Sequence, residues 1–126
     1  MSLLKDKVAI VTGGNGGIGL GISEGLAHEG AKVIIAARNE EKNKDAIEKI
    51  KLSSKDSETF KLDVNDQDSI NNLMKFTTEK YGKIDILVNN AGISRRSDEP
   101  HLLSRNDWND VIDTNLNSIH HMTSAV

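Results

Sequence analysis

Short apolar runs alternate with amphipathic segments along this chain. Residues 8–11, 32–37, 59–64 and 84–88 are rich in β-branched or aliphatic side chains, a pattern typical of strands buried on both faces of a parallel sheet. Between these runs, apolar residues recur at helical spacing over about 17–29 and 40–52, and Ile70, Leu73, Met74 and Thr77 share one face of a third helix. The alternation predicts strand and helix in turn, four times over.

Signals at the ends of these segments support the predicted helices. Gly30 and Gly82 are placed to end the first and third helices, and Asn65 or Asp66 could cap the third. Ser104 and Asp107 resemble a capping box that opens a last helix. The apolar positions of that helix are Trp108, Val111, Ile112, Leu116, Ile119 and Val126.

Alternating strands and helices with short connections predict an α/β fold. We expect a Rossmann-type doubly wound parallel sheet with right-handed crossovers, truncated after about four strands and the following helix. The 126 residues would form one nucleotide-binding domain, without the second half of the fold. In that order the run at 84–88 becomes an exposed edge, so we also expect self-association or a homo-oligomer through this strand and the last helix.

Composition narrows the classes of partner. Apolar residues make up 37% and charged residues 28% of the chain, as in globular proteins, and the net charge is −3. Basic residues are scattered among acidic ones, so we expect neither nucleic acid nor a membrane surface as a partner. The sequence has no cysteine and no apolar run of signal-peptide or membrane-span length, and we expect a cytoplasmic protein.

A glycine cluster follows the first predicted strand at once. Residues 12–19, here called the glycine loop, read Thr-Gly-Gly-Asn-Gly-Gly-Ile-Gly and lead into the first helix. Unpaired backbone N–H groups at such a turn suit a pyrophosphate, and no Gly-Lys-Ser/Thr follows as in a P-loop. The loop therefore predicts a dinucleotide site at Gly13, Asn15, Gly16, Gly17, Ile18 and Gly19.

Polar residues follow the other strands, at the sheet edge where open α/β folds bind ligands. Arg38 and Asn39 end the second strand, where arginine favours the 2′-phosphate of NADP and an acidic residue would favour NAD. Glu40 and Glu41 lie one step into the next helix, and we assign them to its dipole. The sequence predicts NADP(H) over NAD(H), with a solvated surface arginine as the alternative. Asp63, Val64, Asn90, Ala91 and Gly92 complete the predicted cofactor site.

Together these motifs resemble the short-chain dehydrogenase/reductase family over essentially the whole chain. The matching elements are Thr-Gly-x-x-x-Gly-x-Gly at 12–19, Asp63-Val64, Asn-Asn-Ala-Gly at 89–92, and Asn115. The resemblance implies pyrophosphate on the glycine loop, adenine at Asp63 and Val64, and ribose near Asn90–Gly92. It also implies that Asn115 supports a proton relay during hydride transfer between NADP(H) and a carbonyl or secondary alcohol.

The family's catalytic serine and its Tyr-x-x-x-Lys pair lie C-terminal to that asparagine and are not among these residues. Tyr81 is the only tyrosine and Asp85 follows it four residues later, so we expect Tyr81 to be structural. We therefore expect the chain to bind cofactor but to be inactive alone. The alternatives are a non-catalytic nucleotide-sensing module and, disfavoured by the motifs, another Rossmann enzyme such as a methyltransferase.

Two pairs of neighbouring residues each allow a functional and a structural interpretation. Arg95 and Arg96 resemble the sugar-acid dehydrogenases of the family and could meet a substrate carboxylate, although a solvated loop is the simpler interpretation. His120 and His121 point about 100° apart on a helix, and we expect no metal site there.

Overall fold

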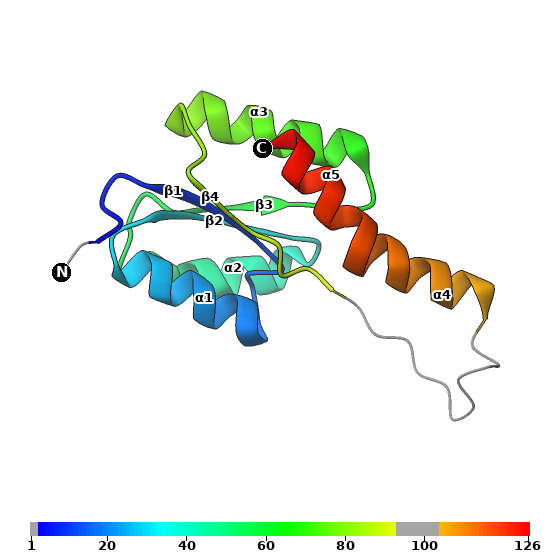
Figure 1. Cartoon of the computed structure of the whole chain (residues 1–126). Helices are drawn as coiled ribbons and strands as arrows, with labels where there is room; N and C mark the ends of the chain where they lie inside the picture. The colour runs from blue at the N-terminus through cyan, green and yellow to red at the C-terminus, as the bar shows by residue number, and fades with distance from the viewer. Residues whose placement is uncertain (1–2, 93–103) are drawn as a thin grey trace.

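A four-stranded parallel sheet forms the centre of the protein (Figure 1). The computed structural model describes residues 3–92 and 104–126. Its strands are β1 (Val8–Thr12), β2 (Lys32–Ala37), β3 (Glu58–Lys61) and β4 (Ile86–Val88), in the order β3-β2-β1-β4. This order is one half of the doubly wound arrangement, and it confirms the predicted fold class.

Helices cover both faces of the sheet (Figure 1). On one face lie α1 (Gly17–His28) and α2 (Glu40–Ile50), and on the other lie α3 (Gln67–Tyr81) and α5 (Ser118–Ala125). Successive strand residues point to opposite faces, so Ile10 and Ile34 pack with the α3 side while Val11 and Ile35 pack with the α1 side. The apolar runs of β1 and β2 are thus explained by burial on both faces.

The residues predicted to end the first and third helices and to cap the third and the last agree with the structure. Gly30 and Gly82 adopt left-handed backbone, with φ of 97° and 79°. Of the two candidate caps for α3, Asp66 is the one used, because its side chain accepts from the Asp68 N–H at 3.0 Å. The Ser104 hydroxyl accepts from the Asp107 N–H at 3.0 Å and begins α4 (Arg105–Ile112).

Three predicted elements are longer than the observed ones. The third strand ends at Lys61 rather than at 64, since it pairs only with β2 and its register stops where Ala37 faces Lys61. Leu62 and Val64 are buried nonetheless, beyond the strand. β4 begins at Ile86 rather than at 84. The helix α2 ends at Ile50 rather than at 52, because the chain turns after Ile50 and leaves Leu52 87% exposed.

The last helix differs most from its prediction. It is interrupted by a π-helical turn, η2 (Asp113–Asn117), between α4 and α5. The residues that it buries are Thr114, Ser118 and Met122, four apart, whereas the expected apolar positions Trp108, Leu116, Ile119 and Val126 are 42–61% exposed. An apolar pattern shows that a helix has an apolar face, but it does not show that this face contacts the sheet.

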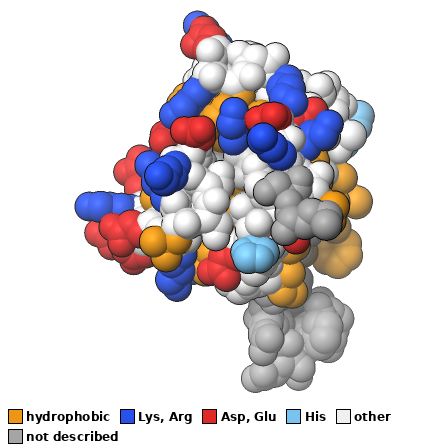
Figure 2. Space-filling model, turned by 90° about the vertical axis from the view of Figure 1, so that its left-hand side faces the viewer, with side chains coloured by type: hydrophobic (Ala, Val, Ile, Leu, Met, Phe, Trp, Pro, Cys, Tyr) orange, Lys and Arg blue, Asp and Glu red, His pale blue; other side chains and the backbone are white. Residues whose placement is uncertain are grey.

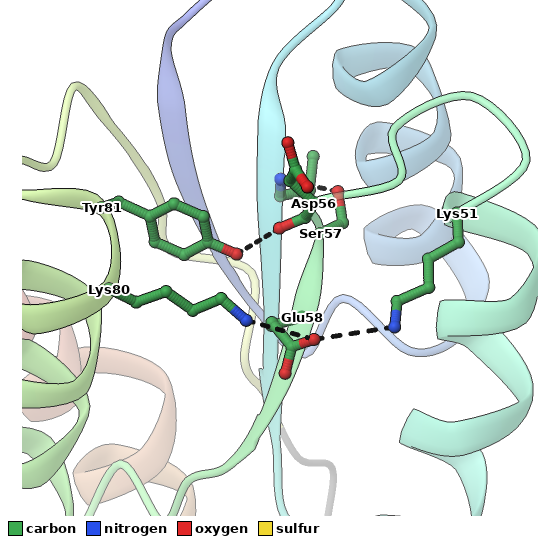
Figure 3. Close-up of polar contacts among 7 residues, drawn as sticks. Lys51, Asp56, Ser57, Glu58, Lys80 and Tyr81 are labelled. Atoms are coloured by element: carbon green, nitrogen blue, oxygen red, sulfur yellow. Dashed lines mark hydrogen bonds and ion pairs between the residues drawn. The ribbon is translucent and has the colours of Figure 1, made fainter.

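Tyr81 joins the end of α3 to the loop before β3 (Figure 3). Its hydroxyl donates to the Asp56 carbonyl, and its ring packs against the α3-side core. Burial, together with the negative charges of Glu58 and Asp56, raises the pKa of Tyr81 to about 12. Beside it, Glu58 forms ion pairs with Lys80 at 3.4 Å and Lys51 at 3.6 Å. These contacts fit the predicted structural role of Tyr81.

Asp85 joins the amino ends of β1 and β4. Its carboxylate accepts from the Val8 N–H at 2.8 Å and lies 3.1 Å from the Lys83 ammonium. The Val8 hydrogen bond and then Lys83 lower the pKa of Asp85 below its ordinary value. This contact fixes the start of β1, the strand that leads into the glycine loop.

Charged side chains of both signs share the surface. On the face drawn in Figure 2, Lys and Arg side chains are interspersed with Asp and Glu. Among the described residues, no helix has the length and apolar character needed to cross a membrane.

Candidate functional site

The glycine loop leaves the carboxyl end of β1 and enters α1. Gly13 and Gly17 have φ of 64° and 54°, in the left-handed region that favours glycine. At Gly19 a Cβ atom would lie 2.9 Å from the Gly13 carbonyl carbon, which real Cβ atoms essentially never do. Gly17 and Ile18 are exposed at the first turn of α1, where free N–H groups suit an anion.

Thr12 ties this loop to the segment after β4. Its hydroxyl accepts from the backbone N–H groups of Asn90 and Ala91, each at 3.0 Å, and donates to the Val88 carbonyl at 3.3 Å. The Asn90 side chain donates in turn to the Gly13 carbonyl at 3.2 Å. The Asn-Asn-Ala-Gly segment therefore holds the loop in place, and the amide of Asn90 is already engaged.

A second tie reaches β2. The Asn15 side chain donates to the Asn43 side-chain oxygen at 2.9 Å, and the Asn43 amide donates to the Ala37 carbonyl at 2.9 Å. Asn43 is 3% exposed, so both contacts are shielded from water. No sequence pattern marked Asn43, because its role depends on partners 6 and 28 residues away.

A cavity of about 310 Å³ opens among the carboxyl ends of the strands. Of the predicted cofactor residues it is lined by Gly13, Asn15, Arg38, Asn39, Asp63, Val64, Ala91 and Gly92. These residues come from four separate segments of the chain. The structure thus brings together the end of every strand that the sequence analysis marked as polar.

The other predicted residues lie around this cavity rather than in its wall. Gly16, Gly17, Ile18 and Gly19 lead into α1, and Ile18 is 79% exposed. Asn115 lies in η2, and its side-chain oxygen is 3.3 Å from where a Cβ on Gly92 would be. Asn115 is therefore next to the end of β4. Arg95 and Arg96 fall outside the described residues.

Three polar residues that the sequence analysis did not assign to the cofactor site also line the cavity. They are Lys42, Asn65 and Thr114. The Asn65 side chain donates to the Thr114 hydroxyl at 2.9 Å, which joins the end of β3 to η2 across 49 residues of sequence. Lys42 is four residues after Arg38 in the sequence, in the first turn of α2, and no sequence pattern marked it.

Positive charge dominates the cavity wall. Arg38 and Lys42 line it together with one carboxylate, Asp63, which accepts from the Asn65 N–H at 2.9 Å. Within residues 3–92 and 104–126, neither Arg38 nor Lys42 takes part in an ion pair. Asn39 lines the same wall, but its side-chain oxygen caps α2 by accepting from the Lys42 N–H at 3.0 Å. In the same part of the chain, no group of three His, Asp or Glu side chains could hold a metal ion.

Known proteins are similar to this chain in sequence and in fold. The profile of the short chain dehydrogenase family matches residues 7–126. The 3-oxoacyl-(acyl-carrier-protein) reductase FabG of Chlamydia muridarum is 46% identical over 127 residues, which cover 99% of this chain and 50% of the relative. The chain spans about half the length of the curated relatives it matches.

Two solved structures of similar chains contain different nicotinamide cofactors. A variant of the actinorhodin polyketide ketoreductase with NADPH has a TM-score of 0.90 at 32% identity, over 99% of this chain and 48% of that one. The 3-ketoacyl-(acyl-carrier-protein) reductase of Brucella melitensis complexed with NADH has a TM-score of 0.88 at 28% identity, over 96% and 49%.

Proposed function

Because the chain belongs to the short-chain dehydrogenase family, as its motifs predicted, we propose that the cavity binds NADP(H) for an oxidoreductase. The reaction would transfer hydride between the nicotinamide and a carbonyl compound or secondary alcohol. The observation that supports this best is the cavity itself, which collects Gly13, Arg38, Asp63 and Gly92 at the carboxyl ends of the four strands.

Each part of the dinucleotide has residues suited to it. The exposed start of α1 at Gly17 and Ile18 would hold the pyrophosphate through backbone N–H groups. Asp63 and Val64 would contact the adenine, and Ala91 and Gly92 would leave room for ribose. We assign Gly16, Gly19 and Asn90 to the same site, as residues that shape the glycine loop rather than contact the ligand.

Arg38 supports NADP(H) over NAD(H). Relatives contain either cofactor, so the preference rests on this chain's own residues. At the end of β2, an acidic side chain would accept from a ribose 2′-hydroxyl, but this chain has Arg38 and Asn39, and Asn39 is engaged as a cap. A charge-assisted hydrogen bond contributes about 1.5–3 kcal/mol.

Titration with NADPH and NADH by calorimetry tests this assignment. We expect NADPH to bind at least about tenfold more tightly, because tenfold corresponds to about 1.4 kcal/mol, and we expect Arg38→Ala to abolish that preference. Equal affinity for the two cofactors, or an unchanged preference in Arg38→Ala, would contradict the NADP assignment. Failure to bind either cofactor would contradict the dinucleotide site as a whole.

Asn115 is the one residue proposed for the chemistry. Its place beside Gly92 suits support of a proton relay at the nicotinamide end of the cavity. A general acid or base is still needed, and these 126 residues contain no Tyr-x-x-x-Lys pair. We infer that they bind cofactor without turnover.

A non-catalytic nucleotide-binding module is the second candidate. The coding sequence after Val126 discriminates between the two candidates. A serine followed by Tyr-x-x-x-Lys supports the oxidoreductase, and a stop codon supports the module.

We also propose that copies of this chain associate. β4 pairs with β1 alone among the described strands, and the last helix exposes Trp108, Leu116 and Ile119. An unpaired strand edge and an exposed apolar face both favour contact with another chain.

A further inference from the structure

Lys42 lies in the first turn of α2 and reaches the cavity that Arg38 lines. Its ammonium nitrogen is 3.8 Å from where a Cβ on Gly16 would be. Gly16 has extended backbone, with φ −170° and ψ 165°, and the 3.8 Å separation is that of ordinary van der Waals contact, so the Lys42 ammonium lies against the glycine loop. The lysine thus bridges the distance between α2 and the glycine loop.

The backbone around Lys42 is held firmly. Its N–H donates to the Asn39 side chain at 3.0 Å, and the next residue, Asn43, is buried and bound to both Asn15 and Ala37. These contacts fix the start of α2 against the glycine loop. The backbone that carries Lys42 is therefore fixed beside the cavity, and its exposed side chain lines the cavity wall.

The charge of the expected ligand calls for more than one cation. A phosphate monoester carries about −1.5 to −2 charges at pH 7. Arg38 supplies one positive charge, and neither Arg38 nor Lys42 is neutralised by an ion pair in the described part of the chain. Glu40 and Glu41, in the same helical turn, do not line the cavity.

We propose that Lys42 and Arg38 together hold the 2′-phosphate of NADP(H), and that Lys42 is a residue that determines cofactor specificity. The inference rests on the proposed NADP(H) site. Its rival is contact between Lys42 and the pyrophosphate on the glycine loop, which is common to both cofactors. Only contact with the 2′-phosphate would change the ratio of the two affinities.

Calorimetric titration of the Lys42→Gln variant with NADPH and NADH tests the proposal. Lys44→Gln is the matched control, because Lys44 is an exposed lysine on the same helix that does not line the cavity. We expect Lys42→Gln to weaken NADPH binding by about tenfold, the effect of one charge-assisted hydrogen bond, and to leave NADH binding unchanged. Lys44→Gln is expected to leave both affinities within about twofold, since an exposed charge is screened by salt.

Several results of these titrations would overturn the proposal. Lys42→Gln could bind NADPH as tightly as Lys44→Gln does, or it could lose NADPH and NADH affinity by the same factor, which indicates the pyrophosphate. If the unsubstituted protein binds neither cofactor, the proposed function fails as well. A preference for NADPH that depends on Arg38 but not on Lys42 would overturn this inference alone.

Discussion

Glycine is required at some positions of this protein and not at others. The space around a Cβ atom placed at each position shows where it is required. A Cβ on Gly19 would meet the Gly13 carbonyl and the Asn90 side chain, both part of the glycine loop's own support. A Cβ on Gly21 would meet nothing within 4 Å, although Gly21 is only two residues further along α1. Gly19 belongs to the glycine loop and Gly21 lies just beyond it, and only Gly19 needs to be a glycine.

Alanine substitutions at these two positions should therefore have opposite effects. We expect Gly19→Ala to lower the free energy of unfolding by about 1–3 kcal/mol through overpacking, and to weaken NADPH binding by displacing the loop. Gly21→Ala should raise the free energy of unfolding by about 0.5–1 kcal/mol, because glycine is a poor helix former. Urea unfolding of both variants measures the difference. Equal stability of the two would contradict the role assigned to Gly19.

The site residues that could be predicted are those marked by a glycine motif or by a position soon after a strand. Arg38, Asp63 and Gly92 follow strands directly, so the strand pattern alone placed them at one edge. Lys42 and Thr114 enter the cavity from helices, and whether they do so depends on how α2 and η2 pack. Side chains that reach a site from a helix leave little trace in the sequence.

At the scale of elements, the pattern located strands and helices better than their ends and faces. The predicted third strand includes Leu62 and Val64 because both are apolar, yet they are buried beyond the last paired residue. In the last helix, Met122 provides the buried apolar contact, while the more conspicuous Trp108 is 59% exposed. Pairing and packing partners decide such details, and they lie far away in the sequence.

The junction between α3 and β3 should make stability depend on pH through Tyr81. Its pKa is about 12 in the folded protein against an ordinary value of 10.0, so the folded state retains a proton that the unfolded state loses. The stabilisation by this group is complete below about pH 10 and is lost as the pH rises toward about 12. Urea unfolding midpoints across this window should fall more steeply for the unsubstituted protein than for Tyr81→Phe.

Tyr81→Phe keeps the ion pairs of Glu58 with Lys51 and Lys80, so comparison of the two proteins isolates the tyrosine hydroxyl. It should also be less stable than the unsubstituted protein at pH 8, because the bond to Asp56 is lost. Parallel pH profiles for the two proteins would show that Tyr81 does not cause the dependence.

For the whole molecule, the order of elements was sufficient to predict the architecture. Parallel strands joined by helices must cross over, and right-handed crossovers on both faces lead to the observed order β3-β2-β1-β4. The same topology brings four strand ends to one edge, which explains why residues as distant in sequence as Gly13 and Gly92 share one cavity. The order of elements does not predict what contacts the edge of β4 and the exposed face of the last helix.

That surface leads to the last prediction, which concerns association. Leu116 is 61% exposed and Trp108 59%, on a helix whose buried side consists of Thr114, Ser118 and Met122. Apolar side chains of this size gain about 1.5–3 kcal/mol each when they are fully buried, so contact between copies is favourable. Sedimentation at low micromolar concentration should reveal oligomers, and Leu116→Glu should dissociate them by placing a charge in the contact. Leu52→Glu is the control, because Leu52 is 87% exposed at the end of α2, away from this helix. A monomer at these concentrations, or equal dissociation by both variants, would show that the exposed face of the last helix does not join copies of the chain.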